Sequence, residues 1–209
     1  MVIQVINFPF CNFYSLERYL RVCSHAYHVL TGAESPSISD IIMLPGVGTF
    51  QQGMDYLLET GLAPMILKHA SAGGRVIGIC LGMQMLLNSS SESPGVEGLG
   101  LIPGVCERIP VAPSFSVPHI GWNSLVLPDF LHSSVVQPRI PSVFSCSDFY
   151  FVHSYFAKTS VADSTFASFE HPSGHLAAAI GLGSVIGFQF HPEKSGSAGY
   201  ALLNHVLGR

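Results

Sequence analysis

Residues 75–85, Arg-Val-Ile-Gly-Ile-Cys-Leu-Gly-Met-Gln-Met, constrain the fold more than any other stretch of the sequence. They predict a buried strand over Arg75–Ile79 that runs directly into a helix from Leu81 to about Asn88, with Cys80 at the corner. Glycines stand two residues before and two residues after Cys80, where so sharp a reversal leaves no room for a side chain. A cysteine in this place lies above a helix N-terminus, whose free amides and positive dipole end favour a thiolate.

A second interpretation of Cys80 is a small core residue, which is the usual role of a lone cysteine. The flanking glycines Gly78 and Gly82 favour the sharp corner and a reactive thiol. This stretch alone leaves both interpretations open.

The order of predicted elements indicates the fold class. Up to residue 88, strands at 2–8, 25–30, 40–44 and 75–79 alternate with helices at 15–23, 50–60, 62–71 and 81–88. Alternation of this kind is typical of a parallel sheet with helices on both faces. Beyond the Ser-, Gly- and Pro-rich loop 89–104 we expect short strands at 105–109, 124–127, 149–152, 165–170, 176–181 and 184–190, followed by a helix at 197–207 with Ser195 as its cap. The prediction is one α/β domain over residues 1–209, in three layers, with a mostly parallel sheet and an antiparallel extension.

Composition excludes several classes of protein. Of 209 residues, 48% are hydrophobic and 11% charged, which suits a sheet covered on both faces. A net charge of -4 gives no basic surface for nucleic acid. The longest apolar run, 176–190, is too short and too rich in glycine to span a bilayer. The N-terminus lacks the basic segment of a signal peptide, so we expect a soluble, cytoplasmic protein.

The five cysteines are scattered along the chain and form no Cys-x-x-Cys pair. This pattern argues against a disulfide framework or a zinc site and favours a reducing compartment. His171 and His175 have metal-ligand spacing, but Pro172 and Gly174 between them indicate a turn, so we expect no metal site there.

Three further stretches carry side chains or amides that can complete a site with Cys80. The first is Gln-Phe-His191-Pro-Glu193-Lys, after the last predicted strand. Residues i and i+2 of an extended chain project to the same side, so His191 and Glu193 can converge. A thiol nucleophile needs a base, and the base needs a carboxylate to hold its tautomer. The alternative is a surface pair beside a proline.

The second stretch, Leu-Pro-Gly-Val47-Gly48, follows the predicted strand at 40–44. A backbone amide from Val47 or Gly48, together with that of Leu81, can bind the oxygen of a tetrahedral intermediate, although most such runs are simply turns. The third stretch ends a strand with His153-Ser154-Tyr155. His153 is a rival base for Cys80, but it lacks a carboxylate two positions on and is as readily a structural histidine.

The combination of these motifs resembles the class I glutamine amidotransferases and, more narrowly, the glutaminase subunits of imidazole glycerol phosphate synthases. The resemblance is carried by Gly-Ile-Cys80-Leu-Gly-Met-Gln, Leu-Pro-Gly-Val-Gly and Phe-His191-Pro-Glu193-Lys-Ser, and it covers nearly the whole chain. Motifs resembling those of that subunit occur at 98–104, at Pro118-His-Ile-Gly-Trp-Asn123 and at Tyr150-Phe-Val-His-Ser-Tyr155.

The resemblance implies a glutaminase that needs no metal or organic cofactor, in which ammonia passes through a (β/α)₈ cyclase partner for histidine biosynthesis. It implies Cys80, His191 and Glu193 as the catalytic triad, and Gly48 and Leu81 at the oxyanion hole. The matching positions for binding of the substrate glutamine are Gln84, Ser154 and Tyr155, and those for the partner interface are Asn12, Trp122 and Asn123.

One segment departs from the family pattern. Where the family has Asp-Tyr-Gly-x-Gly-Asn, this chain reads Asn7-Phe-Pro-Phe-Cys11-Asn12. Proline fixes φ and cysteine resists φ > 0, so the backbone of this loop must differ. Because the loop faces the partner in the family, the departure leaves the partner open.

Three alternatives therefore stand beside the main interpretation. The chain can be a paralogous subunit that supplies ammonia to another acceptor, such as a surface-polysaccharide sugar. It can be a catalytically silent binding subunit, or a cysteine hydrolase that acts on esters or peptides. The stretch 131–147 shows no recognisable pattern.

Overall fold

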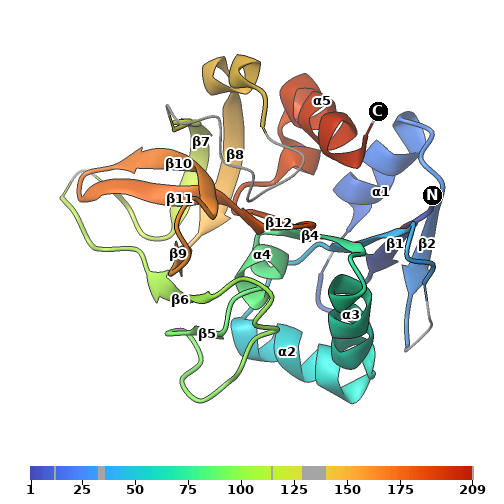
Figure 1. Ribbon diagram of the computed structural model, residues 1–209. Coiled ribbons are helices and arrows are strands. Elements are labelled where there is room, and N and C mark those ends of the chain that lie inside the picture. The colour runs from blue at the N-terminus through green and yellow to red at the C-terminus, as the bar shows by residue number, and fades with distance from the viewer. Residues whose placement is uncertain (12, 33–35, 114, 129–139, 209) are drawn as a thin grey trace.

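A seven-stranded sheet runs through the middle of the molecule (Figure 1). The computed structural model describes residues 1–11, 13–32, 36–113, 115–128 and 140–208. Across the sheet the strands are β10 (Thr165–His171), β11 (Gly174–Leu182), β12 (Val185–Phe188), β4 (Arg75–Ile79), β3 (Ile41–Leu44), β1 (Ile3–Ile6) and β2 (Tyr27–Leu30). Those from β12 to β2 are parallel, and β10 and β11 add an antiparallel edge. The predicted fold class is confirmed.

Helices cover both faces of this sheet, and each face has its own apolar core (Figure 1). Helices α1 (Tyr14–Val22) and α5 (Gly196–Leu207) lie on one face, and α2 (Phe50–Glu59), α3 (Leu62–Ser71) and α4 (Leu81–Met85) on the other. Strands β1, β3 and β12 are buried at every position, which explains why they read as continuous apolar runs. Over the described ranges, no helix has both the length and the apolarity to cross a membrane.

Two smaller sheets flank the main one. One joins β5 (Ser89–Ser90), β6 (Gly104–Arg108) and β9 (Tyr155–Thr159), and the other pairs β7 (His119–Ser124) with β8 (Asp148–His153). Two 3₁₀ helices, η1 (Ser142–Cys146) and η2 (Pro192–Lys194), complete the elements. Most of the stretch 131–147 lies outside the described residues, and η1 occupies its last part.

The prediction of a strand at 124–127 is wrong, because the segment that pairs with β8 lies earlier in the sequence, over His119–Ser124. Only Val126 forms a bridge there, to Ser168. Strand β9 was not predicted because it is only half-buried, with Ala157 its one fully buried residue. An edge strand that is partly exposed to solvent shows no clear alternation of apolar and polar residues.

Helix α4 is shorter than the helix predicted to reach Asn88, because the next loop takes its last carbonyls. The amides of Leu99, Ile102 and Gly100 donate to Met85 O, Leu86 O and Leu87 O, respectively.

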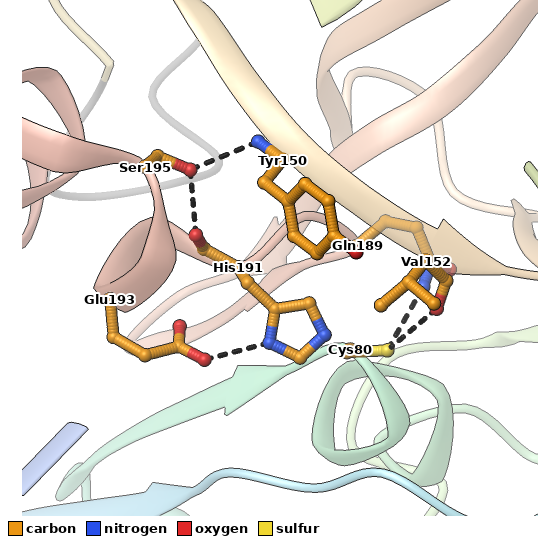
Figure 2. Close-up of polar contacts among 7 residues, drawn as sticks. All are labelled: Cys80, Tyr150, Val152, Gln189, His191, Glu193 and Ser195. Atoms are coloured by element: carbon orange, nitrogen blue, oxygen red, sulfur yellow. Dashed lines mark hydrogen bonds and ion pairs between the residues drawn. The ribbon is translucent and has the colours of Figure 1, made fainter. Parts of the chain in front are cut away.

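The role predicted for Ser195 is also wrong, because its side chain makes no capping hydrogen bond to α5. Its hydroxyl donates to His191 O at 2.6 Å and accepts from the Tyr150 amide at 3.0 Å, which ties β8 to the segment carrying His191 (Figure 2).

Candidate active site

The turn from β4 into α4 holds Cys80 in a strained conformation, with φ 53° and ψ -108°. A non-glycine residue adopts a positive φ only where its surroundings enforce it. A Cβ on Gly78 would lie 2.6 Å from the Gly82 carbonyl, and a Cβ on Gly82 would lie 1.7 Å from Leu44 O. The predicted crowding on both sides of the cysteine is confirmed.

We expect Gly82→Ala to lower the free energy of unfolding by at least about 2 kcal/mol, because β3 or the corner must move to admit a methyl group. Gly32→Ala is the matched control, since nothing lies within 4 Å of a Cβ built there. Urea denaturation followed by circular dichroism measures both. Equal midpoints for Gly82→Ala and the wild type would show that the corner does not need this glycine.

His191 and Glu193 meet just beyond the end of β12 (Figure 2). His191 Nδ1 lies 2.7 Å from Glu193 Oε1, and both side chains are buried. A carboxylate only accepts, so Nδ1 carries the proton and Nε2 is turned to the Cys80 side of the ring. Burial alone would lower the pKa of the His191 imidazole, but the Cys80 sulfur and the Glu193 carboxylate together raise it. The surroundings therefore favour the charged form of the His191 imidazole.

The Cys80 sulfur lines a cavity of about 280 Å³. The sulfur is 3.8 Å from Val152 O and 3.8 Å from Gln189 Nε2 (Figure 2). The same cavity is lined by the predicted oxyanion and substrate residues Val47, Gly48, Leu81, Gln84, Ser154 and Tyr155. A small substrate can therefore reach the sulfur with all of these residues around it.

Two of the predicted oxyanion amides, those of Val47 and Leu81, already donate hydrogen bonds to other groups of the protein. Leu81 N donates to Gly46 O at 3.3 Å, and the Val47 amide donates to the Cys11 sulfur. Burial raises the pKa of the Cys11 thiol, and this amide contact partly opposes the rise. The Phe10 ring lies over Gly48, 3.1 Å from where its Cβ would stand. The loop that departs from the family pattern thus packs directly on the oxyanion segment.

His153 is held in a tautomer that does not serve as a base for Cys80. Its Nδ1 lies 2.7 Å from Tyr155 O, which only accepts, so Nδ1 carries the proton. Its Nε2 then accepts from His119 Nδ1 at 3.2 Å. Burial lowers the pKa of His119 to about 4 and that of His153 to about 3, so both are neutral at pH 7. His153 lines the cavity as a neutral residue that positions its neighbours.

These two histidines make stability depend on pH. Their pKa values in the folded protein lie below the ordinary 6.5, so only the unfolded chain takes up their protons between about pH 6 and 4.5. The contribution of these two histidines to the free energy of unfolding is therefore fully present above pH 6.5 and falls on acidification, by at least about 2 kcal/mol at pH 4.5. Urea titrations across this range measure it. His119→Phe, which fits among Phe115, Phe151 and Phe169, should flatten the slope, and an unchanged slope would contradict the assignment.

Sequence reasoning missed Glu92, which also lines the cavity. Its carboxylate accepts the Phe50 amide at 2.7 Å and so caps the start of α2. The signal available was one of two glutamates, Glu92 and Glu97, in a Ser- and Gly-rich loop of a chain with few charges. Of the residues predicted for a partner interface, Trp122 is 58% exposed on β7 and lies edge-on to Tyr150, and Asn123 follows it half-buried. Asn12 lies outside the described residues.

In the ranges that the structure describes, no three His, Cys, Asp or Glu side chains are grouped to hold a metal ion. His171 instead joins Ser173 in the β10–β11 turn, with Nδ1 2.7 Å from the hydroxyl.

Comparison with known proteins agrees with the class that fold and site define. The family described as Glutamine amidotransferase class-I matches residues 5–206, so the chain belongs to the class I glutamine amidotransferases. Within it, the chain is 36% identical over 208 residues to the imidazole glycerol phosphate synthase subunit HisH of Geobacillus sp. (strain WCH70), covering 98% of this chain and 95% of that protein. It is 38% identical over 211 residues to the protein of that name from Geobacillus thermodenitrificans, covering 99% and 95%.

Solved structures agree on the fold. A crystal structure of a glutamine amidotransferase superposes with a TM-score of 0.74 at 15% identity and covers 100% of both chains. The structure of PurLQS from Thermotoga maritima gives 0.70 at 17% identity, covering 99% of this chain and 97% of that one.

Proposed function

We propose that this chain is the glutaminase subunit of an imidazole glycerol phosphate synthase. It hydrolyses glutamine to glutamate and ammonia and delivers the ammonia to a (β/α)₈ cyclase subunit in histidine biosynthesis. The observation that carries the proposal is the contact of Glu193 with His191, whose imidazole in turn interacts with Cys80 on the cavity wall, in a chain whose full-length relatives bear that name.

The chemistry follows from the order of the three side chains. The Cys80 thiolate attacks the side-chain carbonyl carbon of glutamine, and the oxygen of the tetrahedral intermediate takes the charge. The His191 imidazolium protonates the departing nitrogen, which leaves as ammonia and yields a glutamyl thioester. His191 then takes a proton from water, whose oxygen attacks the thioester and releases glutamate and the thiolate. Glu193 orients the imidazole throughout and stabilises its charged form.

The cavity offers complementary groups for the rest of the substrate. We assign glutamine binding to Gln84, Ser154 and Tyr155, and assign Glu92 to the α-ammonium group because its carboxylate is the anionic group on the cavity wall. We propose that the backbone amides of Val47, Gly48 and Leu81 form the oxyanion hole. The amides of Val47 and Leu81 can donate to the oxygen of the intermediate once they leave their internal partners.

The remaining assignments concern assembly. We propose a heterodimer with the cyclase, in which Asn12, Trp122 and Asn123 face the partner. The exposed Trp122 ring supports this face. Residues 1–209 are proposed to act as one domain, since the main sheet takes strands from both halves of the chain. The five free cysteines support a reducing compartment, the cytoplasm.

The test is to co-express the chain with the (β/α)₈ cyclase of the same organism and to isolate the complex. We expect co-purification and glutamine-dependent formation of imidazole glycerol phosphate and the aminoimidazole carboxamide ribotide. A complex that forms with another barrel protein and aminates a different acceptor, such as a polysaccharide sugar, would replace this assignment with a paralogous amidotransferase.

A further inference from the structure

Gln189 is a fully buried polar side chain with no role in the steps above. It stands two residues before His191, in the bend that follows β12, and its carboxamide lies beside Cys80 (Figure 2). Nε2 is 3.8 Å from the Cys80 sulfur, and Oε1 is 3.2 Å from Gln84 Nε2.

The direction of each hydrogen bond follows from the neighbours. Gln84 Nε2 also lies 3.2 Å from Tyr155 O, which only accepts, so the nitrogen of Gln84 must face that carbonyl. The same nitrogen then donates its second proton to Gln189 Oε1. A reversed Gln189 amide would set two N–H groups against each other. The Gln189 group that faces the sulfur is therefore the N–H donor.

A chain of contacts holds this arrangement in place. The Tyr155 carbonyl accepts from Gln84 on one side and from His153 Nδ1 on the other. His153 is in turn oriented by His119, whose ring packs between Phe151 and Phe169. The orientation of Gln189 is thus set by packing as far away as β7.

Besides its interaction with His191, the sulfur has two protein contacts that favour opposite protonation states. Val152 O accepts, so it stabilises the thiol, whereas the Gln189 N–H donates, so it stabilises the thiolate. We propose that Gln189 is a further residue of the catalytic centre, whose amide holds the Cys80 thiolate and is aimed at it by Gln84. The inference rests on the proposed function only in taking Cys80 as the nucleophile.

The test measures the rate of Cys80 alkylation by iodoacetamide against pH, in the full chain bound to its cyclase, with the modified peptide identified by mass. Gln189→Met keeps a similar volume and removes the N–H. We expect the midpoint of alkylation to rise by about one pH unit and the rate below the midpoint to fall about tenfold, the size of effect typical for a hydrogen bond to a charged group. The titratable groups whose charges act with that of Cys80 include Cys11, Cys106 and His191, and Glu92, His153 and Tyr155 line the same cavity. The variant changes none of them.

Two further variants complete the design. Gln4→Met is the control, because it removes the amide of another buried glutamine, on β1. That amide donates to Asp40 Oδ2 at 3.0 Å, and its loss should leave the midpoint of Cys80 alkylation unchanged. Gln189→Glu keeps the shape and places a carboxylate at the sulfur, so it raises the midpoint as well and serves if Gln189→Met does not fold. Unchanged midpoints in the folded Gln189 variants would overturn the proposal. Alkylation needs no glutamine turnover, so this outcome is separate from a failure of the proposed function.

Discussion

Replacing Cys80 by alanine will abolish glutamine hydrolysis by the complex, with an expected loss of about 10⁴-fold or more in kcat. The loss is large because the sulfur is the atom that attacks, and the remaining groups only bind and polarise the substrate. Ammonia release at saturating glutamine, with the cyclase and its ligand present, measures it.

The control is Cys146→Ala, at an exposed cysteine in η1, which should keep full activity. Thermal melting of both variants shows whether the fold is intact. Equal ammonia release by the wild type and Cys80→Ala would support a silent binding subunit in place of an enzyme.

The isolated chain will hydrolyse glutamine about 10²-fold more slowly than the complex, the size of effect expected for one missing oxyanion donor. His191 and Glu193 are already in contact in the isolated chain, and the His191 imidazole interacts with Cys80. Two of the three predicted oxyanion donors are not free, because Leu81 N donates to Gly46 O and the Val47 amide donates to the Cys11 sulfur. We propose that docking of the partner shifts this segment, so that its amides become able to stabilise the tetrahedral intermediate.

Steady-state ammonia release by the chain alone and with the cyclase and its ligand tests this dependence. The rise should lie mainly in kcat, because the donors act on the intermediate more than on bound glutamine. Alkylation of Cys80 should differ little between the two forms, as it needs no oxyanion hole. Vigorous turnover without a partner would contradict this account of the closed segment.

Much of this arrangement is predictable because its elements carry strong local signals. The apolar runs of β1, β3 and β4 and the spacing in α1, α2 and α3 have the periods of buried strands and amphipathic helices. The sharp turn at Cys80 can be predicted from the sequence because only glycine fits at its two crowded positions, Gly78 and Gly82. The contact of His191 with Glu193 was predicted from spacing on an extended chain, but Glu193 lies in the 3₁₀ helix η2, so a helical turn and not an extended chain brings the pair together.

The features that were missed depend on contacts between distant parts of the chain. Helix α4 ends early because a loop thirteen to sixteen residues on takes its carbonyls, which no local pattern shows. Gln189 lies in the bend that follows β12, and its role appears only when Cys80 and Gln84 lie beside it. The contact of Cys11 with Val47 likewise needs the tertiary structure. From the sequence alone, the segment 7–12, which departs from the family pattern, indicated only that its backbone differs.

The most direct test of the central claim, that Cys80 attacks the glutamine carboxamide, is covalent trapping with a glutamine-mimicking chloroketone. The complex is treated with the reagent, with and without excess glutamine, and the labelled peptide is identified by mass spectrometry. We predict labelling at Cys80 that glutamine prevents and that His191→Ala slows strongly. Labelling of another cysteine, or labelling of Cys80 that glutamine does not reduce, would contradict the account.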